Sequence, residues 1–183
     1  MNFINKSALK IIDVNSSNNL VEIKESRYIK DKLSKGLFAK QNIKKGTKIV
    51  IYFGDVLDEE ELLEKYNENK DVMKYIRKGY DFIVDGSIGY NTKNINLSGV
   101  YVNDILKLKS KSMKDMEHYH KSRNICNVEV LNTTDFPVYI AKRDIKKGQE
   151  LFIHYGLHYW LLDLGVSPID LKRKYKNILK KFN

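Results

Sequence analysis

Short apolar or β-branched runs recur along the chain and are separated by Gly, Asn and Asp residues. Runs of this length between turn-forming residues are typical of β-strands. They predict strands at residues 20–23, 47–53, 80–84, 127–131, 136–141 and 150–153. The segment from residue 59 to about residue 77 predicts a helix, because Asp58 suits the N-cap and three glutamates follow where the helix dipole favours negative charge. The polar stretches 91–96 and 107–122 lack periodicity and predict loops, the second of them long.

A second helix is predicted in the C-terminal tail. Ser167 suits its N-cap and Pro168 its first helical position. The apolar residues that follow fall on one helical face: Leu171, Tyr175, Ile178, Leu179 and Phe182. We therefore expect this helix to dock on the rest of the protein by that face.

The sequence I-K-K-G occurs twice, at residues 43–46 and 145–148, each time between two predicted strands. Glycine at the end of such a turn supplies a backbone conformation with positive φ. The two copies predict two similar β units within one domain. The whole pattern indicates a mostly β (α+β) fold with small helices inserted or appended.

Composition narrows the function classes. A chain of 183 residues with 42% hydrophobic content forms one domain of ordinary size and is not disordered throughout. The single cysteine, Cys126, excludes an internal disulfide and a Cys-based zinc site, so we expect a reducing, intracellular environment. The four histidines have no spacing that predicts a metal site. No apolar run approaches the ~18 residues of a membrane span, and residues 1–9 lack the apolar segment of a signal peptide, so we expect a soluble protein without membrane contact.

The net charge of +10 is concentrated in the tail. Residues 171–183 hold six of the 33 basic residues and no acidic one. These lysines either solvate the outer face of the helix or make a weak contact with nucleic acid. No basic stripe elsewhere supports a nucleic-acid groove.

Five short motifs occur in order: G-L-F-A at 36–39, Y-F-G at 52–54, Y-V-N-D at 101–104, N-V-E at 127–129 and E-L-F-I-H-Y-G at 150–156. This ordered set resembles the SET-domain family of protein lysine methyltransferases. The resemblance implies a SET-type β-clip fold of several small sheets with a pseudoknot-like threading, one inserted helix and a C-terminal helix. The implied organisation is an N-terminal extension at 1–19, a SET domain at 20–160 with an insert helix at 58–77 and a long loop at 105–123, and a basic C-terminal helix at 161–183.

The family resemblance also implies an activity. It implies transfer of a methyl group from S-adenosylmethionine to the ε-amine of a protein lysine, with S-adenosylhomocysteine as product and no metal. Histone tails are the leading substrate class, and a histone substrate would place the protein in the nucleus. We expect the protein to be a monomer or a homodimer.

Two tyrosines are the expected catalytic residues. Tyr155 matches the family tyrosine whose hydroxyl lies beside the transferring methyl, and Tyr52 matches one that lines the lysine channel. A free lysine has a pKa of about 10.4, so at pH 7 almost all of it is protonated and has no lone pair for attack. An aromatic channel desolvates the ammonium, which lowers its pKa, and places π faces around the positive charges. We therefore expect no dedicated carboxylate base.

The same resemblance assigns the cofactor site to Lys35, Gly36, Leu37, Gly79, Tyr80, Asn103, Asp104 and Trp160. Two residues depart from the family pattern: Ser34 replaces a glycine, and Asp104 replaces the histidine of an N-H-S motif. Either Trp160 or Tyr159 stacks on adenine, or Trp160 anchors the C-terminal helix in the core. That helix is our candidate replacement for a Cys-rich zinc segment of relatives. On the substrate side, Phe82 is expected beside the bound peptide. Val130 stands where some relatives carry a tyrosine, and its smaller side chain predicts room for more than one methylation.

Two other functions stay open at this point. Ser34 and Asp104 motivate a catalytically inactive SET-like module that binds peptide or chromatin. The basic tail motivates a nucleic-acid-binding or chromatin-binding protein.

Overall fold

The fold is given by a computed structural model, which describes residues 19–26, 28, 35–69, 72, 75–78, 83–91, 93–131 and 136–182. Its strands are β1 (Val21–Glu25), β2 (Lys35–Ala39), β3 (Lys48–Ile51), β4 (Asp55–Leu57), β5 (Ile76–Lys78), β6 (Ile83–Asp85), β7 (Val128–Leu131) and β8 (Val138–Ala141). Its α-helices are α2 (Glu59–Glu68), α3 (Met113–Lys121), α4 (Leu157–Asp163), α5 (Pro168–Arg173) and α6 (Lys176–Phe182). Short 3-10 helices are η2 (Gly86–Asn91), η3 (Ile95–Leu97), η4 (Gly99–Tyr101) and η5 (Ser122–Asn124).

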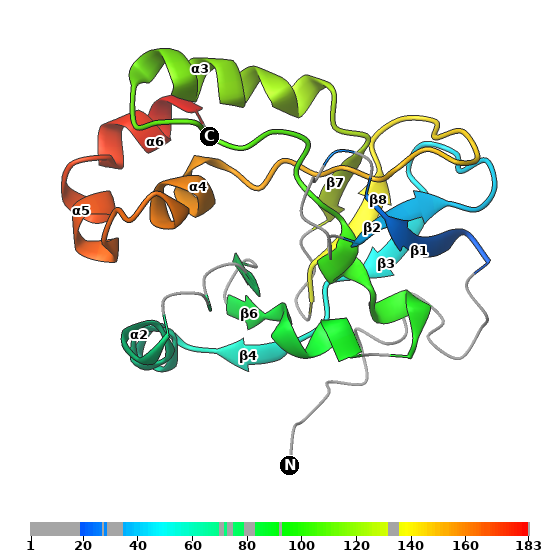
Figure 1. Cartoon of the computed structure of the whole chain (residues 1–183), viewed down its shortest axis with the longest axis horizontal. Helices are drawn as coiled ribbons and strands as arrows, with labels where there is room; N and C mark the ends of the chain where they lie inside the picture. The colour runs from blue at the N-terminus through cyan, green and yellow to red at the C-terminus, as the bar shows by residue number, and fades with distance from the viewer. Residues whose placement is uncertain are drawn as a thin grey trace.

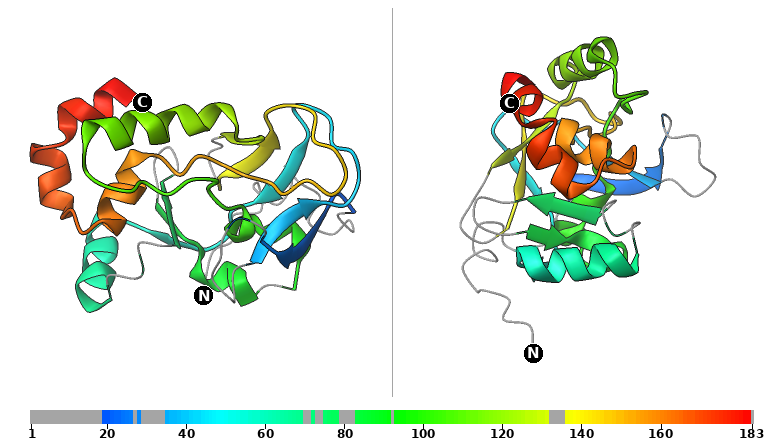
Figure 2. Two further views of the ribbon diagram at one scale, coloured as in Figure 1. Left: turned by 45° about the horizontal axis from the view of Figure 1, so that its top comes forward. Right: turned by 90° about the vertical axis from the view of Figure 1, so that its left-hand side faces the viewer.

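The strands form small antiparallel sheets. β1 pairs with β2, β8 lies between β3 and β7, and β6 lies between β4 and β5 (Figure 1). Helices α3 to α6 gather at one end of the molecule, beside the sheets (Figure 2). This arrangement confirms the predicted class of a mixed α+β fold built from small sheets. Among the described residues, no helix has the length and apolar character that a membrane crossing requires.

Strands form in most of the predicted runs, and the part of the run 80–84 that precedes Ile83 lies outside the described residues. The strand predicted at 150–153 is wrong. Glu150 and Phe152 form only isolated bridges, to Phe38 and Asn103. A segment that alternates between partners on two sides does not build a continuous ladder. β2, β4 and β5 were not among the predicted strands, because runs of three to five residues carry too little alternation to stand out.

The helix predicted from residue 59 to 77 is correct at its start and wrong at its end. Asp58 accepts hydrogen bonds from the N–H groups of Glu60 and Glu61, and the Glu61 side chain accepts from the Asp58 N–H, which completes a capping box. The helix ends at Glu68, and Ile76–Lys78 form strand β5 against β6. Pairing with β6 therefore overrides the local helical pattern.

The prediction of a long loop at residues 105–123 is also wrong, because this segment contains helix α3. The Ser112 hydroxyl accepts from the Asp115 N–H and caps its start. Met116 and Tyr119 are fully buried on its inner face. A mostly polar helix of nine residues has little stability alone, so its burial against the C-terminal helices decides the structure.

The tail forms two short helices, α5 and α6, and not the single predicted helix. The predicted N-cap is confirmed, since the Ser167 hydroxyl accepts from the Asp170 N–H and Pro168 follows. The predicted apolar face also packs inward, because the break between the helices turns α6 back beside α3 (Figures 1 and 2). Several tail lysines form ion pairs with acidic residues of the same chain: Lys172 with Glu59, Lys174 with Asp170 and Lys181 with Glu117.

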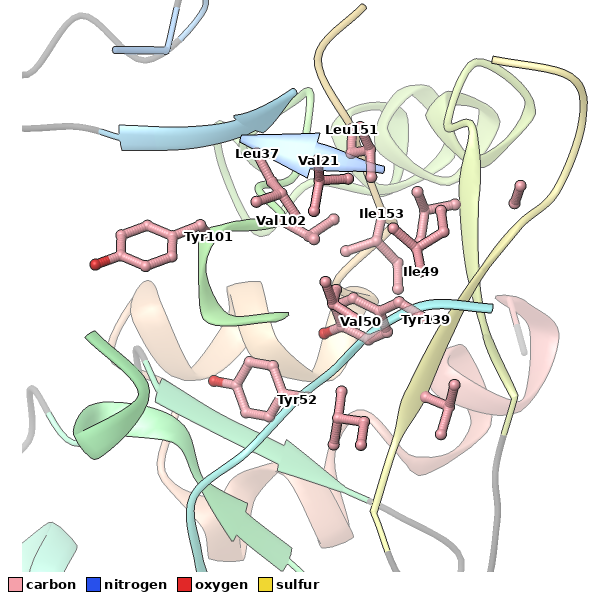
Figure 3. Packing of buried hydrophobic residues seen from close by; sticks show 14 of the residues in the cluster. Val21, Leu37, Ile49, Val50, Tyr52, Tyr101, Val102, Tyr139, Leu151 and Ile153 are labelled. Carbon is pink, nitrogen blue, oxygen red and sulfur yellow. The ribbon is translucent and has the colours of Figure 1, made fainter. Parts of the chain in front are cut away.

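Two hydrophobic cores result. The sheet core lies between the small sheets and includes Val21, Leu37, Ile49, Val50, Tyr52, Val102, Tyr139, Leu151 and Ile153 (Figure 3). The helix core includes Leu108, Met116, Tyr119, Leu157, Trp160, Leu161, Leu162, Val166 and Leu171. Tyr155 packs against both cores. The segment before α4 therefore lies at the junction between them.

The two I-K-K-G turns contact each other directly. Ile43 and Ile145 exchange reciprocal backbone hydrogen bonds of 2.8 Å. Gly46 has φ 80° and Gly148 has φ 82°, as the turn pattern predicted. The repeated sequence therefore marks two paired turns that join segments about a hundred residues apart.

We expect Gly148→Ala to reduce the free energy of unfolding by ~1–2 kcal/mol, because alanine pays the steric cost of positive φ. No atom lies within 4 Å of the added Cβ, so the change measures backbone strain alone. Urea unfolding followed by Trp160 fluorescence checks this. Lys147→Ala, at the exposed neighbouring position, serves as the control. Equal stabilities for the two variants would contradict the prediction.

Candidate active site

Four tyrosine side chains surround one cation, the guanidinium of Arg77. Its Cζ lies 3.6 Å from the ring centroid of Tyr155. It also lies 5.7 Å from the Tyr52 ring and 5.8 Å from the Tyr159 ring, and Nε donates a hydrogen bond of 3.2 Å to the hydroxyl of Tyr139. We call Tyr52, Tyr139, Tyr155 and Tyr159 the tyrosine cage. The structure thus brings together Tyr52 and Tyr155, which lie more than one hundred positions apart in the sequence.

Each ring is positioned by the backbone that carries it. Tyr52 follows β3, and its hydroxyl donates to the carbonyl of Tyr75 at 2.6 Å. Gly86 leaves room for that ring, since an added Cβ would lie only 2.5 Å from it. The hydroxyl of Tyr155 donates to the carbonyl of Val102 at 3.1 Å. Hydroxyls that are already bonded hold the rings in place around the central cation.

Burial keeps these phenols neutral. It raises the pKa of Tyr155 and of Tyr52 far above the ordinary value, although the nearby Arg77 charge offsets part of this. Burial also raises the pKa of Tyr139, and it raises the pKa of Tyr159 to about 12. The cage is therefore a set of uncharged aromatic faces at physiological pH, and the guanidinium retains its charge.

A second group of predicted residues meets beside the cage. The amide nitrogen of Asn103 donates to the carbonyl of Lys35 at 2.9 Å. Gly36 has no room for a side chain, because a Cβ there would collide with the carboxylate of Glu150. Leu37 is fully buried in the sheet core. Lys35, Gly36 and Asn103 thus form one cluster around a buried acidic side chain.

This cluster is joined to the cage through the backbone. Asn103 and Phe152 form an isolated parallel bridge, and the Ile153 N–H donates to the Asn103 carbonyl at 2.9 Å. Two residues further along the second segment lies Tyr155. The predicted cofactor segment and the predicted catalytic tyrosine therefore lie side by side.

Val130 stands opposite Tyr139 in the register between β7 and β8, and its side chain is 37% exposed. The register places it next to a cage residue, and its role on the substrate side stays a prediction. Gly79, Tyr80 and Phe82, together with Ser34, lie outside the described residues.

Comparison with known proteins identifies the family. The SET domain model matches residues 34–156, which is more than half of the chain. The chain belongs to the SET-domain family. Members of this family are typically S-adenosylmethionine-dependent lysine methyltransferases. No curated protein sequence matches the chain.

Solved structures show the same fold. Polycomb Repressive Complex 2 of Chaetomium thermophilum, in an autoinhibited conformation bound to S-adenosylmethionine, is similar with a TM-score of 0.52 and 20% identity, over 83% of this chain and 17% of that chain. An apo form of the same complex with mutations in Ezh2 gives a TM-score of 0.50 and 22% identity, over 79% and 16%. This SET domain thus spans less than a fifth of the length of those chains.

Asp104, which replaces the family histidine, is the most connected polar residue of this part of the SET domain. Its Oδ2 accepts from the Tyr119 hydroxyl at 2.5 Å, from the Tyr155 N–H at 2.9 Å and from Trp160 Nε1 at 3.0 Å. The Tyr119 hydroxyl also accepts from the Gly156 N–H at 3.0 Å. One carboxylate thus fastens α3, α4 and the segment that contains Tyr155 to each other.

Trp160 lies in the helix core, as in the alternative that it anchors the C-terminal helices. It is 5% exposed within the helix core, and its indole N–H is bound to Asp104. Contact between Trp160 and adenine stays a prediction.

The histidines and the cysteine form no second site within the described part of the chain. His118 and His120 lie on α3, and no group of three or more metal-ligating side chains occurs among the described residues. Burial raises the pKa of the Cys126 thiol to about 12, so it is not a thiolate at physiological pH.

Three residues of the site carry no signal of their role in the sequence. Arg77 stands at the end of a predicted helix, Tyr119 in a predicted loop and Tyr139 in a predicted strand. None of them stands in a recognisable motif. Only their contacts across the fold show what they do.

We expect Asp104→Ala to reduce the free energy of unfolding by about 3 kcal/mol or more, because it leaves several buried donors without an acceptor. Urea unfolding measures the loss, and Trp160 is the only tryptophan of the chain and reports on the helix core. Asp144→Ala is the matched control, since that exposed carboxylate accepts from the Lys45 N–H and from Lys44. A similar small loss for both variants would show that Asp104 does not join the elements.

Proposed function

We propose that this SET domain is a protein-lysine N-methyltransferase that moves a methyl group from S-adenosylmethionine to a lysine ε-amine. One observation carries the proposal. A cage of neutral tyrosines that contains Tyr155 and Tyr52 holds a side-chain cation, directly beside the segment that contains Asn103. The cage provides what a lysine needs in order to be methylated, and the adjacent cluster has the chemistry to hold the methyl donor.

The cage favours the reaction by desolvation and alignment. Removing an ammonium from water lowers its pKa and so raises the fraction with a free lone pair. Each aromatic face contributes ~0.5–2 kcal/mol of attraction to a cation that remains charged. Fixing the amine against the methyl carbon makes a bimolecular step effectively unimolecular. Because Tyr155 stays neutral, its part is to orient and not to act as an ionised base.

The cluster around Gly36 fits the methyl donor by its acceptors. The Lys35 carbonyl and the buried Glu150 carboxylate suit a ligand that carries an ammonium group, a sulfonium and hydroxyls. We assign binding to Lys35, Gly36 and Asn103, with the Asp104 bonds holding the neighbouring backbone. When bound, S-adenosylmethionine supplies an electrophilic methyl group on sulfur.

Histone tails are the proposed substrate class, on the ground of family resemblance, and nuclear localisation is proposed with it. The exposed acidic residues Glu59, Glu60 and Glu64 of α2 offer a negative surface to a lysine-rich peptide. We propose that Val130 leaves room for more than one methyl group. A catalytically inactive SET-like module that binds peptide or chromatin is the alternative, which Ser34 and Asp104 motivate.

Tyr155→Phe should reduce kcat for lysine methylation about 100-fold, because the ring loses the hydroxyl bond that fixes its position. The assay uses labelled S-adenosylmethionine with core histones and whole-cell protein, and mass spectrometry locates the modified lysine. Tyr175→Phe makes the same chemical change in the tail, away from the cage, and should retain the wild-type rate.

Calorimetry with S-adenosylmethionine separates the ways in which this test can fail. If the folded protein binds the cofactor and labels no protein, the substrate class is wrong. If it shows no binding at hundreds of micromolar, the inactive module is the better description.

The pH dependence follows from the raised pKa of Tyr155 and the ordinary pKa of the substrate. Since kcat/KM reports ionisations of the free species, it should rise about tenfold per pH unit between pH 7 and 9 as free lysine loses its proton. Because the pKa of Tyr155 is raised, its phenol stays neutral throughout this pH range. We therefore expect no decrease of kcat/KM between pH 7 and 9. Steady-state rates at constant ionic strength test this. A decline below pH 9 would show that a cage phenol ionises there.

A further inference from the structure

The tyrosine cage already contains a cation that belongs to the chain itself. The Arg77 guanidinium lies against the Tyr155 ring and within cation–π distance of Tyr52 and Tyr159. This position is next to the ring of Tyr155, the residue expected to face the reacting amine. The cage is therefore filled by an arginine in this structure.

Arg77 is held there by cation–π contacts and one hydrogen bond. Within the described part of the chain it forms no ion pair with an acidic side chain, and its bond to Tyr139 has a neutral acceptor. The acidic residue on the adjacent strand, Asp85, is instead paired with Lys65 at 2.9 Å and accepts from the Ser87 N–H. A guanidinium that is desolvated without a carboxylate partner is less firmly held than one in a salt bridge.

The strand that carries Arg77 is suited to release. β5 has three residues and lies at the edge of its sheet, where β6 is its one partner among the described strands. Short edge strands with one hydrogen-bonded neighbour open locally at lower cost than central strands. Withdrawal of Arg77 therefore does not require the rest of the sheet to separate.

Size and like charge argue against joint occupancy of the cage by Arg77 and a substrate lysine. The Cζ of an arginine and the Nζ of a lysine are separated from their Cα atoms by the same number of bonds. A substrate lysine that reaches the Tyr155 ring would place its ammonium in the volume that the guanidinium fills, and the two positive charges would repel each other. Only one of the two cations can occupy the cage.

We propose that the tyrosine cage is a site for alkylammonium and alkylguanidinium groups, and that Arg77 is its intramolecular occupant, which must leave before a substrate lysine binds. The site rests on the geometry of the cage, and the competition with substrate rests on the proposed methyltransferase function. Arg77 thus sets the affinity for the lysine side chain and does not take part in methyl transfer.

The site itself is tested without catalysis. The probes are n-butylammonium and n-butylguanidinium, titrated by NMR into the full-length chain as wild type, Arg77→Ala and Arg77→Met. We expect at least tenfold tighter binding to both variants than to wild type, with shifts confined to tyrosine ring signals. Lys44→Ala removes an exposed cation that is paired with Asp144 and contributes nothing to the cage, and it should behave as wild type. Equal affinity for all four proteins would overturn the proposal.

Circular dichroism and thermal melting accompany the titration. Arg77→Met keeps the aliphatic stem of the side chain, so it should remain folded even if Arg77→Ala does not. If both variants are unfolded, Arg77 is a structural residue of the cage and the proposal is wrong.

Methyl transfer then tests the competition. In Arg77→Met, KM for a lysine-containing peptide should fall at least fivefold with kcat unchanged. An unchanged or increased KM would overturn the competition and leave the methyltransferase function standing. If neither wild type nor Arg77→Met transfers a methyl group, the proposed methyltransferase function fails. Binding of the small cations to the Arg77 variants alone would still show that Arg77 occupies a cation site.

Discussion

One buried carboxylate ties the two cores of this SET domain together. Asp104 accepts hydrogen bonds from a side chain of α3, a side chain of α4 and the backbone of Tyr155. Hydrogen bonds to a charged acceptor contribute ~1.5–3 kcal/mol each, and an unmatched donor in the same place is costly. The helix core therefore has a defined position relative to the sheet core, and the segment at their junction is the one that carries Tyr155.

Tyr155 is placed by both cores and by the hydroxyl bond to Val102. The same burial that positions the ring removes water from its surroundings, raises its pKa and makes the cage attractive to cations. Such a site binds any side-chain cation that reaches it. Arg77 reaches the cage from β5. The buried aromatic surroundings therefore explain both the binding of Arg77 and the proposed binding of a substrate lysine.

The C-terminal helices close this part of the fold mainly by apolar packing. The single cysteine cannot build a Cys-rich zinc segment, and the described residues contain no metal-binding cluster. Leu171 is buried and Ile178, Leu179 and Phe182 pack on the helix core. Burial of side chains of this size contributes ~1.5–3 kcal/mol each when complete, which is enough to hold two short helices that are unstable by themselves. The lysines of the tail remain on the outer face, several of them paired with acids.

The sequence alone determined the features that depend on neighbouring residues or on an ordered set of motifs: the family, the caps at Asp58 and Ser167, the paired glycine turns and the apolar face of the tail. These features rest on contacts within a few positions or on residue types that few other patterns share. Tertiary structure alone decided that residues 76–78 form a strand, that α3 exists and that Arg77 enters the cage. The reason is that the deciding partners, β6, the helix core and four tyrosines, are distant in sequence, and their pairing and burial energies exceed the weak local preferences of those segments.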